Sequence, residues 1–257
     1  MLTLEQLVCG YGPPRGSVVD AVSLTVDAGA FVCLLGRNGA GKSTLMRTLA
    51  GLQPPLAGIA RLDGDEVHSL SAPERARRIA VVLTERPSSP GLTVDDVVRL
   101  GRQPFTGWDG RLTDNDEALA DEAVNAAGAT PFLGRLIDDL SDGERQRVMI
   151  ARAMAQTPRL MVLDEITAFL DLPGRVEVMA MLRQRARETG SAILLSSHDL
   201  DLSLQLADIV WLLDGSGALQ VGTPEALIER GLIGEAFDTP DVAFSAERGR
   251  FELNSRH

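Results

Sequence analysis

The chain has 257 residues, of which 44% are hydrophobic, enough for one large α/β domain or for a core with a subdomain. Acidic residues outnumber basic ones by 36 to 25, and this net charge of −11 argues against a nucleic-acid partner. No apolar stretch approaches a membrane span and the N-terminus lacks signal-peptide features, so we expect a cytoplasmic protein. Cys9 and Cys33 lie in apolar strand-like runs, which indicates buried hydrophobic side chains rather than a disulfide or metal site.

The first fifty residues pass from strand-like to helical patterns. Strand-like runs cover 2–8 and 18–26, and a Gly/Pro-rich turn at 10–14 joins them, which indicates an antiparallel β layer. A buried strand is expected at 30–35, followed by a helix at 42–50.

The segment between that strand and that helix fits the phosphate-binding pattern G-x-x-x-x-G-K-[ST]. Its glycines let backbone N–H groups surround the β- and γ-phosphates, Lys42 adds a positive charge, and the Ser43 hydroxyl can bind Mg²⁺. The sequence therefore predicts a nucleoside triphosphate site. The expected contact residues are Gly36, Arg37, Asn38, Gly39, Ala40, Gly41, Lys42, Ser43 and Thr44.

The middle of the chain becomes predominantly helical. A short strand is expected at 59–62, a helix with a capping box at Ser71, and a strand at 79–83. Residues 86–155 then have the character of an inserted helical subdomain. The expected helix starts lie near Thr93, Thr113 and Asp142.

Strand–helix alternation resumes after 155. Strands are expected at 160–163 and 192–196, with a helix between them that begins after Pro173 and stops at Gly190. This alternation predicts an α/β fold with a parallel sheet covered on both faces. The expected domain is 1–237, with a core at 1–85 and 156–237, one more helix at 222–232, and a strand or tail at 238–257.

Two adjacent acids follow the strand at 160–163. Asp164 can hold Mg²⁺, directly or through water, and Glu165 can polarise an attacking water. An acidic pair alone is equally compatible with a solvated turn or a helix cap. Together with the phosphate loop, the pair predicts nucleotide hydrolysis.

The segment 140–144 allows two interpretations. Ser141 and Glu144 have the spacing of a capping box, which requires nothing more than a helix start. A serine hydroxyl and a glycine amide at a helix N-terminus also form an anion site that can contact a γ-phosphate. The Arg-Gln-Arg run that follows, and the Asp-Glu pair about twenty residues later, favour the second interpretation.

In their order along the chain these motifs resemble the ATP-binding-cassette (ABC) ATPase family. Residues 36–44 match its Walker A loop, 140–144 resemble its L-S-G-G-Q signature, and 160–164 with Glu165 match Walker B and the catalytic glutamate. The resemblance covers nearly the whole chain. It implies a RecA-like P-loop NTPase core that uses ATP and Mg²⁺, with the N-terminal antiparallel layer and the helical subdomain added to it.

The resemblance also implies roles for three further residues. Asp171 belongs to the D-loop, and His198 matches the switch histidine that helps Glu165 position water. Tyr11, the only tyrosine, falls where the family places the aromatic ring that stacks on adenine. Taken alone, a turn tyrosine and a strand-end histidine are more often incidental.

The chain departs from the family pattern at several positions. The signature has Asp142 for its usual first glycine and Glu144 for glutamine, whereas Ser141 and Gly143, the expected phosphate contacts, are kept. The glutamine expected after the strand at 79–83 is absent. Glu85 is the candidate for its place, where a carboxylate can still reach Mg²⁺ or water.

The family mechanism requires two cassettes that face each other head to tail. Each ATP lies between Walker A of one copy and Ser141 and Gly143 of the other, so a homodimer is implied. ATP closes the pair, and hydrolysis with loss of phosphate reopens it.

A single cassette without a membrane segment resembles importers in which a separate integral membrane permease supplies the channel. The implied partners are that permease and a substrate-binding protein, with the cassette at the cytoplasmic face of the membrane. Residues 101–112 resemble ATPases that drive uptake of iron–siderophore complexes, haem and cobalamin. Alternatively, residues 101–112 are only a helix end and an ordinary loop anchored by Trp108. The alternative function is a soluble cassette ATPase that powers assembly of a cytosolic complex, as in iron–sulfur cluster biogenesis.

Overall fold

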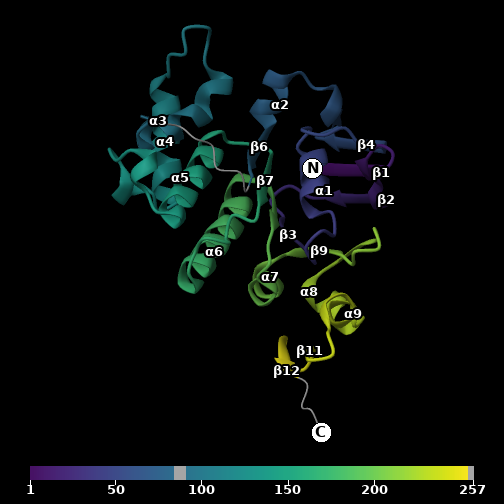
Figure 1. Cartoon of the computed structure of the whole chain (residues 1–257). Coiled ribbons are helices and arrows are strands. Elements are labelled where there is room, and N and C mark those ends of the chain that lie inside the picture. Colours follow the sequence, from purple (N-terminus) through teal and green to yellow (C-terminus); the bar gives the residue numbers. More distant parts are fainter. Residues whose placement is uncertain (84–90, 254–257) are drawn as a thin grey trace.

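Two β-sheets form the centre of the molecule (Figure 1). The computed structural model describes residues 1–83 and 91–253. The N-terminal sheet is antiparallel with strand order β2-β1-β4-β5, and the central sheet has order β10-β9-β3-β8-β7-β6. Neighbours in the central sheet are parallel except for β10, which pairs with β9 in the antiparallel sense. The strands of these sheets are β1 Leu2–Tyr11, β2 Gly16–Val26, β3 Phe31–Gly36, β4 Ala57–Leu62, β5 Asp65–Glu66, β6 Ile79–Val82, β7 Leu160–Asp164, β8 Ala192–Ser196, β9 Ile209–Leu213 and β10 Leu219–Gly222.

The middle strands of the central sheet are buried on both faces. In β3, Phe31, Cys33 and Leu35 belong to one apolar core, whereas Val32 and Leu34 belong to the other. Side chains alternate across a strand, so an uninterrupted apolar run is what two covered faces require. One core lies among the helices and the other is shared with the N-terminal sheet and the first helix. The predicted fold class, with its antiparallel N-terminal layer and its parallel sheet, is confirmed.

Helices surround the central sheet, and α3, α4 and α5 form a group at one side of it (Figure 1). Within the described residues, four helices begin with capping boxes, at Ser71, Thr93, Thr113 and Ser141. The sequence predicts the boxes at Ser71 and Ser141, and at Thr93 and Thr113 it predicts the helix starts. The helices are α1 Lys42–Leu49, α2 Ala72–Arg78, α3 Val94–Arg99, α4 Asp114–Ala126, α5 Asp142–Ala155, α6 Leu172–Thr189, α7 Leu200–Leu206, α8 Pro224–Glu229 and α9 Leu232–Phe237. Among the described residues, no helix is long and apolar enough to cross a membrane.

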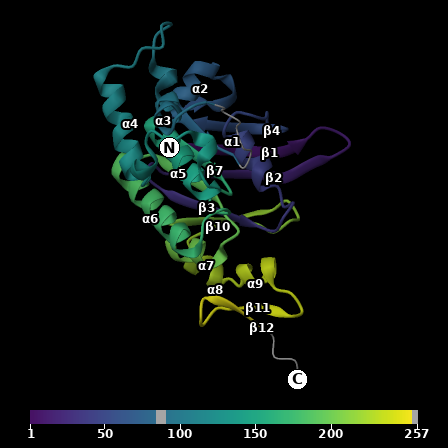
Figure 2. The same ribbon diagram turned by 60° about the vertical axis from the view of Figure 1, so that its left-hand side comes forward.

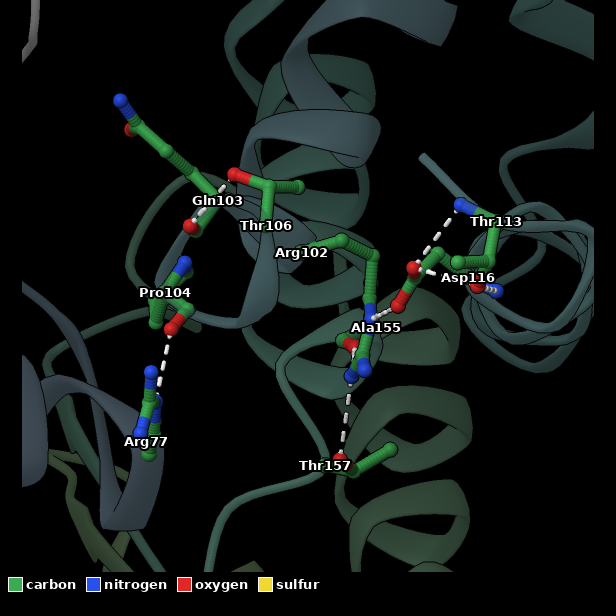
Figure 3. Close-up of polar contacts among 9 residues, drawn as sticks. All are labelled: Arg77, Arg102, Gln103, Pro104, Thr106, Thr113, Asp116, Ala155 and Thr157. Carbon is green, nitrogen blue, oxygen red and sulfur yellow. Dashed lines mark hydrogen bonds and ion pairs between the residues drawn. The ribbon is translucent and has the colours of Figure 1, made fainter. Parts of the chain in front are cut away.

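A buried ion pair fixes the helical group around the 3₁₀ turn η2, Leu100–Phe105. The Arg102 guanidinium donates to Asp116 at the start of α4 (2.9 Å) and to the Ala155 carbonyl at the end of α5 (2.8 Å), as Figure 3 shows. A Cβ on the preceding Gly101 would lie 2.3 Å from the Arg152 carbonyl oxygen, so only glycine allows this approach. Three elements are therefore held together at one point.

The C-terminal region differs from the single helix expected at 222–232. Gly231, with φ of 72°, separates α8 from α9, because glycine adopts a left-handed conformation easily. The following residues form a hairpin of β11 (Val242–Ser245) and β12 (Arg250–Leu253). Figure 2 shows this hairpin beside α9 and far from the α3–α5 group.

Candidate active site

The phosphate loop connects the carboxyl end of β3 to α1, as the sequence predicts. Gly39 and Gly41 adopt φ values of 81° and 104°, which other residues adopt only with strain. A Cβ on Gly41 would also lie 3.3 Å from the Val18 backbone and side chain. The glycines thus allow the loop to turn tightly against the N-terminal sheet.

Lys42 is held inside this loop. Its ammonium group donates to the carbonyls of Gly36 (2.9 Å) and Arg37 (3.4 Å), and the residue is only 5% exposed. Burial lowers the pKa of Lys42, although the negative charges of Glu165 and Asp164 act against that shift. The charges of the two acids at the end of β7 therefore act on the Lys42 ammonium group.

The side chain of Arg37 turns away from the loop. It donates to the backbone carbonyls of Ala236 (2.8 Å) and Asp238 (3.0 Å) at the end of α9. Only the backbone of Arg37 therefore remains available for the predicted contact with the nucleotide. The guanidinium instead links the loop to the C-terminal region.

Asp164 and Glu165 are held by Ser196 at the end of β8. The Ser196 hydroxyl donates to Asp164 at 2.5 Å and accepts the Glu165 N–H at 3.0 Å. Asp164 and Ser196 are buried, and Glu165 adopts φ of 54°, an uncommon conformation for a residue with a side chain. No separate role was predicted for Ser196, because a serine at a strand end carries no signal of its own.

Glu165 and His198 are in direct contact beside a small cavity. The Nε2 atom of His198 lies 2.6 Å from the Glu165 carboxylate, and the two groups line a space of about 230 Å³. A water needs about 30 Å³, so this space can hold an attacking water beside both groups. A carboxylate paired with an imidazole can orient such a water and accept its proton.

The donors near the loop suit Mg²⁺ rather than a transition metal. The described residues contain no cluster of three His, Cys, Asp or Glu side chains that would hold a metal alone. Mg²⁺ is typically held by one or two protein oxygens together with substrate phosphates and water. Ser43 and the buried Asp164 are the two residues near the loop that can supply such oxygens.

The signature segment begins α5 with a complete capping box. The Ser141 hydroxyl donates to the Glu144 carboxylate at 2.7 Å, and that carboxylate also accepts from the Ser141 N–H at 2.8 Å. These bonds hold the pKa of Glu144 below its ordinary value. Arg135 pairs with the other carboxylate oxygen at 3.0 Å. The glutamate found in place of glutamine therefore serves the helix start.

Two further predicted residues lie in defined positions. The Tyr11 hydroxyl is 3.2 Å from the Thr44 hydroxyl, and Arg15 lies 5.5 Å from the centre of the Tyr11 ring. Asp171 caps α6 by accepting the Gly174 N–H at 3.0 Å. Glu85, the candidate for the missing glutamine, lies outside the described residues.

Comparison with known proteins identifies the family. The family model described as ABC transporter matches residues 19–168. An uncharacterised ABC transporter ATP-binding protein of Methanocaldococcus jannaschii is 39% identical over 255 residues, 99% of this chain and 87% of the relative. The chain belongs to the ABC transporter family. The predicted assignment to this family as an ATPase is thereby confirmed.

Two relatives of this cassette are named as transport or import ATP-binding proteins. The achromobactin transport ATP-binding protein of Dickeya dadantii is 35% identical over 92% of this chain and 87% of its own length. The hemin import ATP-binding protein of Streptomyces coelicolor is 41% identical over 90% of this chain and 81% of its own length. A solved dimeric bacterial ABC transporter cassette shares the fold, with a TM-score of 0.76 at 24% identity, covering 87% of this chain and 99% of that one.

Proposed function

We propose that this cassette is the ATP-hydrolysing subunit of an importer for chelates of the siderophore, haem or cobalamin class. Relatives named for transport of such compounds match nine tenths of the chain or more, and this observation carries the proposal. The segment 101–112, which resembles such importers, supports it. The proposed partners are an integral membrane permease and a substrate-binding protein, which place the cassette at the cytoplasmic face of the membrane.

The active-site roles follow from the contacts around the phosphate loop. ATP binds with its phosphates against the loop backbone and Lys42, and Tyr11 stacks on the base. Ser43 and Asp164 hold Mg²⁺, which neutralises phosphate charge. Glu165, fixed by Ser196 and paired with His198 at 2.6 Å, positions the attacking water.

We further propose a head-to-tail homodimer in which Ser141, Asp142, Gly143 and Glu144 of one copy contact ATP on the other. The N-terminus of α5 favours an anion, and a solved relative of the same fold is dimeric. In the single chain the Ser141 hydroxyl donates to Glu144. To contact a γ-phosphate, the Ser141 hydroxyl must therefore give up its hydrogen bond to Glu144 and donate to the phosphate instead.

A pull-down with a trapped variant tests the transport role. Glu165→Gln should bind ATP without turning it over, which holds the dimer closed. Tagged Glu165→Gln is incubated with detergent-solubilised membranes and ATP, and co-purifying proteins are identified by mass spectrometry. The matched control is Glu165→Gln without ATP, and Lys42→Ala with ATP provides a second control.

Recovery of a multi-span membrane protein that depends on ATP supports the importer, and its identity narrows the chelate. Recovery of soluble assembly proteins alone would instead support the alternative of a soluble assembly ATPase. If Glu165→Gln hydrolysed ATP at the wild-type rate, Glu165 would not have its proposed role. Whether the cassette binds a membrane protein would still be tested by the same pull-down.

A further inference from the structure

His198 lies in a short connection between a strand and a helix. It occupies the middle of residues 197–199, after the end of β8 and before the start of α7. Its side chain is 46% exposed and contacts the Glu165 carboxylate at 2.6 Å. Packing alone does not fix a side chain that is half exposed. The position of the His198 ring therefore depends on the backbone that carries it.

Asp199, the next residue, fixes the end of this connection. Its N–H donates to the Ser197 hydroxyl at 3.0 Å. One oxygen of its carboxylate accepts the Leu202 N–H at 3.1 Å and thereby caps α7. The Asp199 side chain is only 15% exposed, and a carboxylate that is largely removed from water needs a partner for its second oxygen as well.

Arg175, in the first turn of α6, supplies that partner. Its Nη1 atom donates to the second Asp199 oxygen at 3.4 Å, and its Nε atom donates to the Leu170 carbonyl at 2.9 Å. One rigid guanidinium group therefore joins the connection after β8 to the segment that leads from β7 into α6. Arg175 and Asp199 also line the small cavity beside Glu165 and His198.

Leu170 is a firm anchor for this link. The Ala168 N–H donates to the Glu165 carbonyl at 3.2 Å, so the chain turns directly after Glu165. The Leu170 N–H donates to the Thr167 carbonyl at 3.2 Å. Leu170 is buried, and a Cβ on Gly143 would lie 3.3 Å from its Cδ2 atom. The residue therefore packs against the start of α5, which holds its carbonyl in place for Arg175.

These contacts hold the Glu165–His198 pair from two sides. Ser196 joins the ends of β7 and β8 through Asp164 and the Glu165 N–H. Arg175 joins the two connections that follow those strands. Glu165 and His198 meet between the two links, so their contact depends on both of them.

We propose that Arg175 is a positioning residue for ATP hydrolysis, which holds the His198 ring against Glu165 through Asp199. This inference rests on the roles proposed above for Glu165 and His198. Without the guanidinium group, the connection that carries His198 loses its attachment to the Leu170 carbonyl. Within residues 1–83 and 91–253, no hydrogen bond or ion pair joins Arg175 to the phosphate loop, so ATP binding does not need it.

The test separates hydrolysis from binding. Phosphate release is followed in a single turnover, with the full chain in excess over γ-³²P-labelled ATP, because this assay resolves rates far below that of the wild type. Misplacement of a catalytic group costs roughly 10- to 100-fold, so we expect Arg175→Gln to slow phosphate release by that factor. The Kd for ATP, measured by calorimetry without Mg²⁺, should stay within twofold. A wild-type rate of release, or a loss of affinity that accounts for the fall, would overturn the proposal.

Arg183→Gln is the matched control. Arg183 lies on the same helix and pairs with Asp208 at 3.1 Å, and its side chain is 32% exposed, compared with 35% for Arg175. The substitution removes the same group from an equivalent ion pair outside the cavity. It should change neither the rate of phosphate release nor the affinity for ATP. Circular dichroism confirms that both variants are folded.

A second background distinguishes positioning of His198 from a general loss of structure. If Arg175 acts through His198, its substitution has no further effect once the imidazole is gone. Arg175→Gln combined with His198→Ala should therefore release phosphate within threefold of the rate of His198→Ala alone. A combined variant more than threefold slower would overturn the proposal.

NMR of ¹⁵N-labelled histidine observes the ring directly. The chain has three histidines, and His198→Ala identifies the signals of His198. Arg175→Gln should move those signals and leave the other two histidines unchanged, whereas Arg183→Gln should move none. Unmoved His198 signals in Arg175→Gln would overturn the proposal.

These outcomes are distinct from failure of the proposed function. None of the measurements needs a permease, so the importer role can fail while the inference about Arg175 stands. A wild-type rate in His198→Ala would remove the proposed role of His198, and this inference with it. A wild-type rate in Arg175→Gln beside a slow His198→Ala would overturn the inference alone.

Discussion

Lys42 is the only lysine in the sequence, so the pKa of its ammonium group can be measured without signals from other lysine side chains. Burial lowers the pKa of its ammonium group, and Glu165 and Asp164 oppose that shift. We expect a pKa below the ordinary lysine value of about 10.4, and an increase when phosphates bind beside it. Reductive methylation with ¹³C-formaldehyde gives one side-chain NMR signal to titrate with and without ADP. A pKa at or above the ordinary value in the free protein would contradict the buried position.

Ser196 is expected to matter for hydrolysis more than for binding. Its hydroxyl contacts Asp164 and the Glu165 N–H, so Ser196→Ala should let Glu165 leave its uncommon backbone conformation. Misplacement of a catalytic group lowers the rate by roughly 10- to 100-fold, so we expect such a fall in kcat with ATP affinity nearly unchanged. Ser203→Ala, another buried serine, is the control. Equal kcat in wild type and Ser196→Ala would show that the β7 acids hold their positions without it.

At the level of elements, the Arg102–Asp116 pair holds η2, α4 and α5 together. Hydrogen bonds from the Thr113 hydroxyl and N–H, followed by Arg102, lower the pKa of Asp116. Breaking a buried pair costs about 3 kcal/mol, so we expect Asp116→Asn to lower the free energy of unfolding by about that amount at pH 7. Asp109→Asn breaks an exposed pair with Arg111 at 3.6 Å and should cost almost nothing.

The pH dependence of that loss has a definite sign. A carboxyl whose pKa is lower in the folded state stabilises the fold above its unfolded value, and the stabilisation disappears as pH falls through the folded pKa. The difference between wild type and Asp116→Asn should therefore be full above about pH 5 and shrink below about pH 4. Urea unfolding at several pH values measures it. A difference that stays constant down to pH 3 would contradict the assigned interactions.

Local signals explain which elements the sequence predicts. Capping boxes depend on residues three positions apart, so Thr93 and Thr113 indicate their helices without tertiary information. The apolar run of β9 is too short for its pattern to distinguish a strand from a helix. Its place in the sheet depends on pairing with β3. The break at Gly231 was not predicted, because glycine alone does not distinguish a helix end from a turn. A strand or tail was expected after 238, but the pairing of β11 with β12 was not.

For the whole molecule, motif order in the sequence predicts the fold and the position of the phosphate loop. Contacts between distant segments could not be predicted, since they depend on the completed packing. The free hydroxyl of Ser191 and the contact of Arg37 with Ala236, 199 residues away, are two examples. Neither residue type carries a pattern that indicates its partner.

The Arg37 contact implies reciprocal coupling between ATP and the C-terminal region. Phe251 packs on Phe237 and Phe244 at ring distances of 6.3 and 5.1 Å, so α9 and the hairpin form one unit. If ATP orders the loop, it must also restrain the α9 carbonyls that accept from Arg37, because coupling between two sites is symmetric. We expect ATP to slow amide exchange across α9 several-fold in wild type, and this protection to vanish in Arg37→Ala.

Hydrogen-exchange mass spectrometry, with and without Mg-ATP, measures that protection. Arg230→Ala, which alters an exposed arginine between α8 and α9, is the control and should keep it. Linkage also requires that opening of α9 lowers the ATP affinity of the wild-type protein by the same factor by which ATP protects α9. Protection retained in Arg37→Ala would mean that the C-terminal region senses ATP by another route. Loss of affinity without loss of protection would place Arg37 at the phosphates instead.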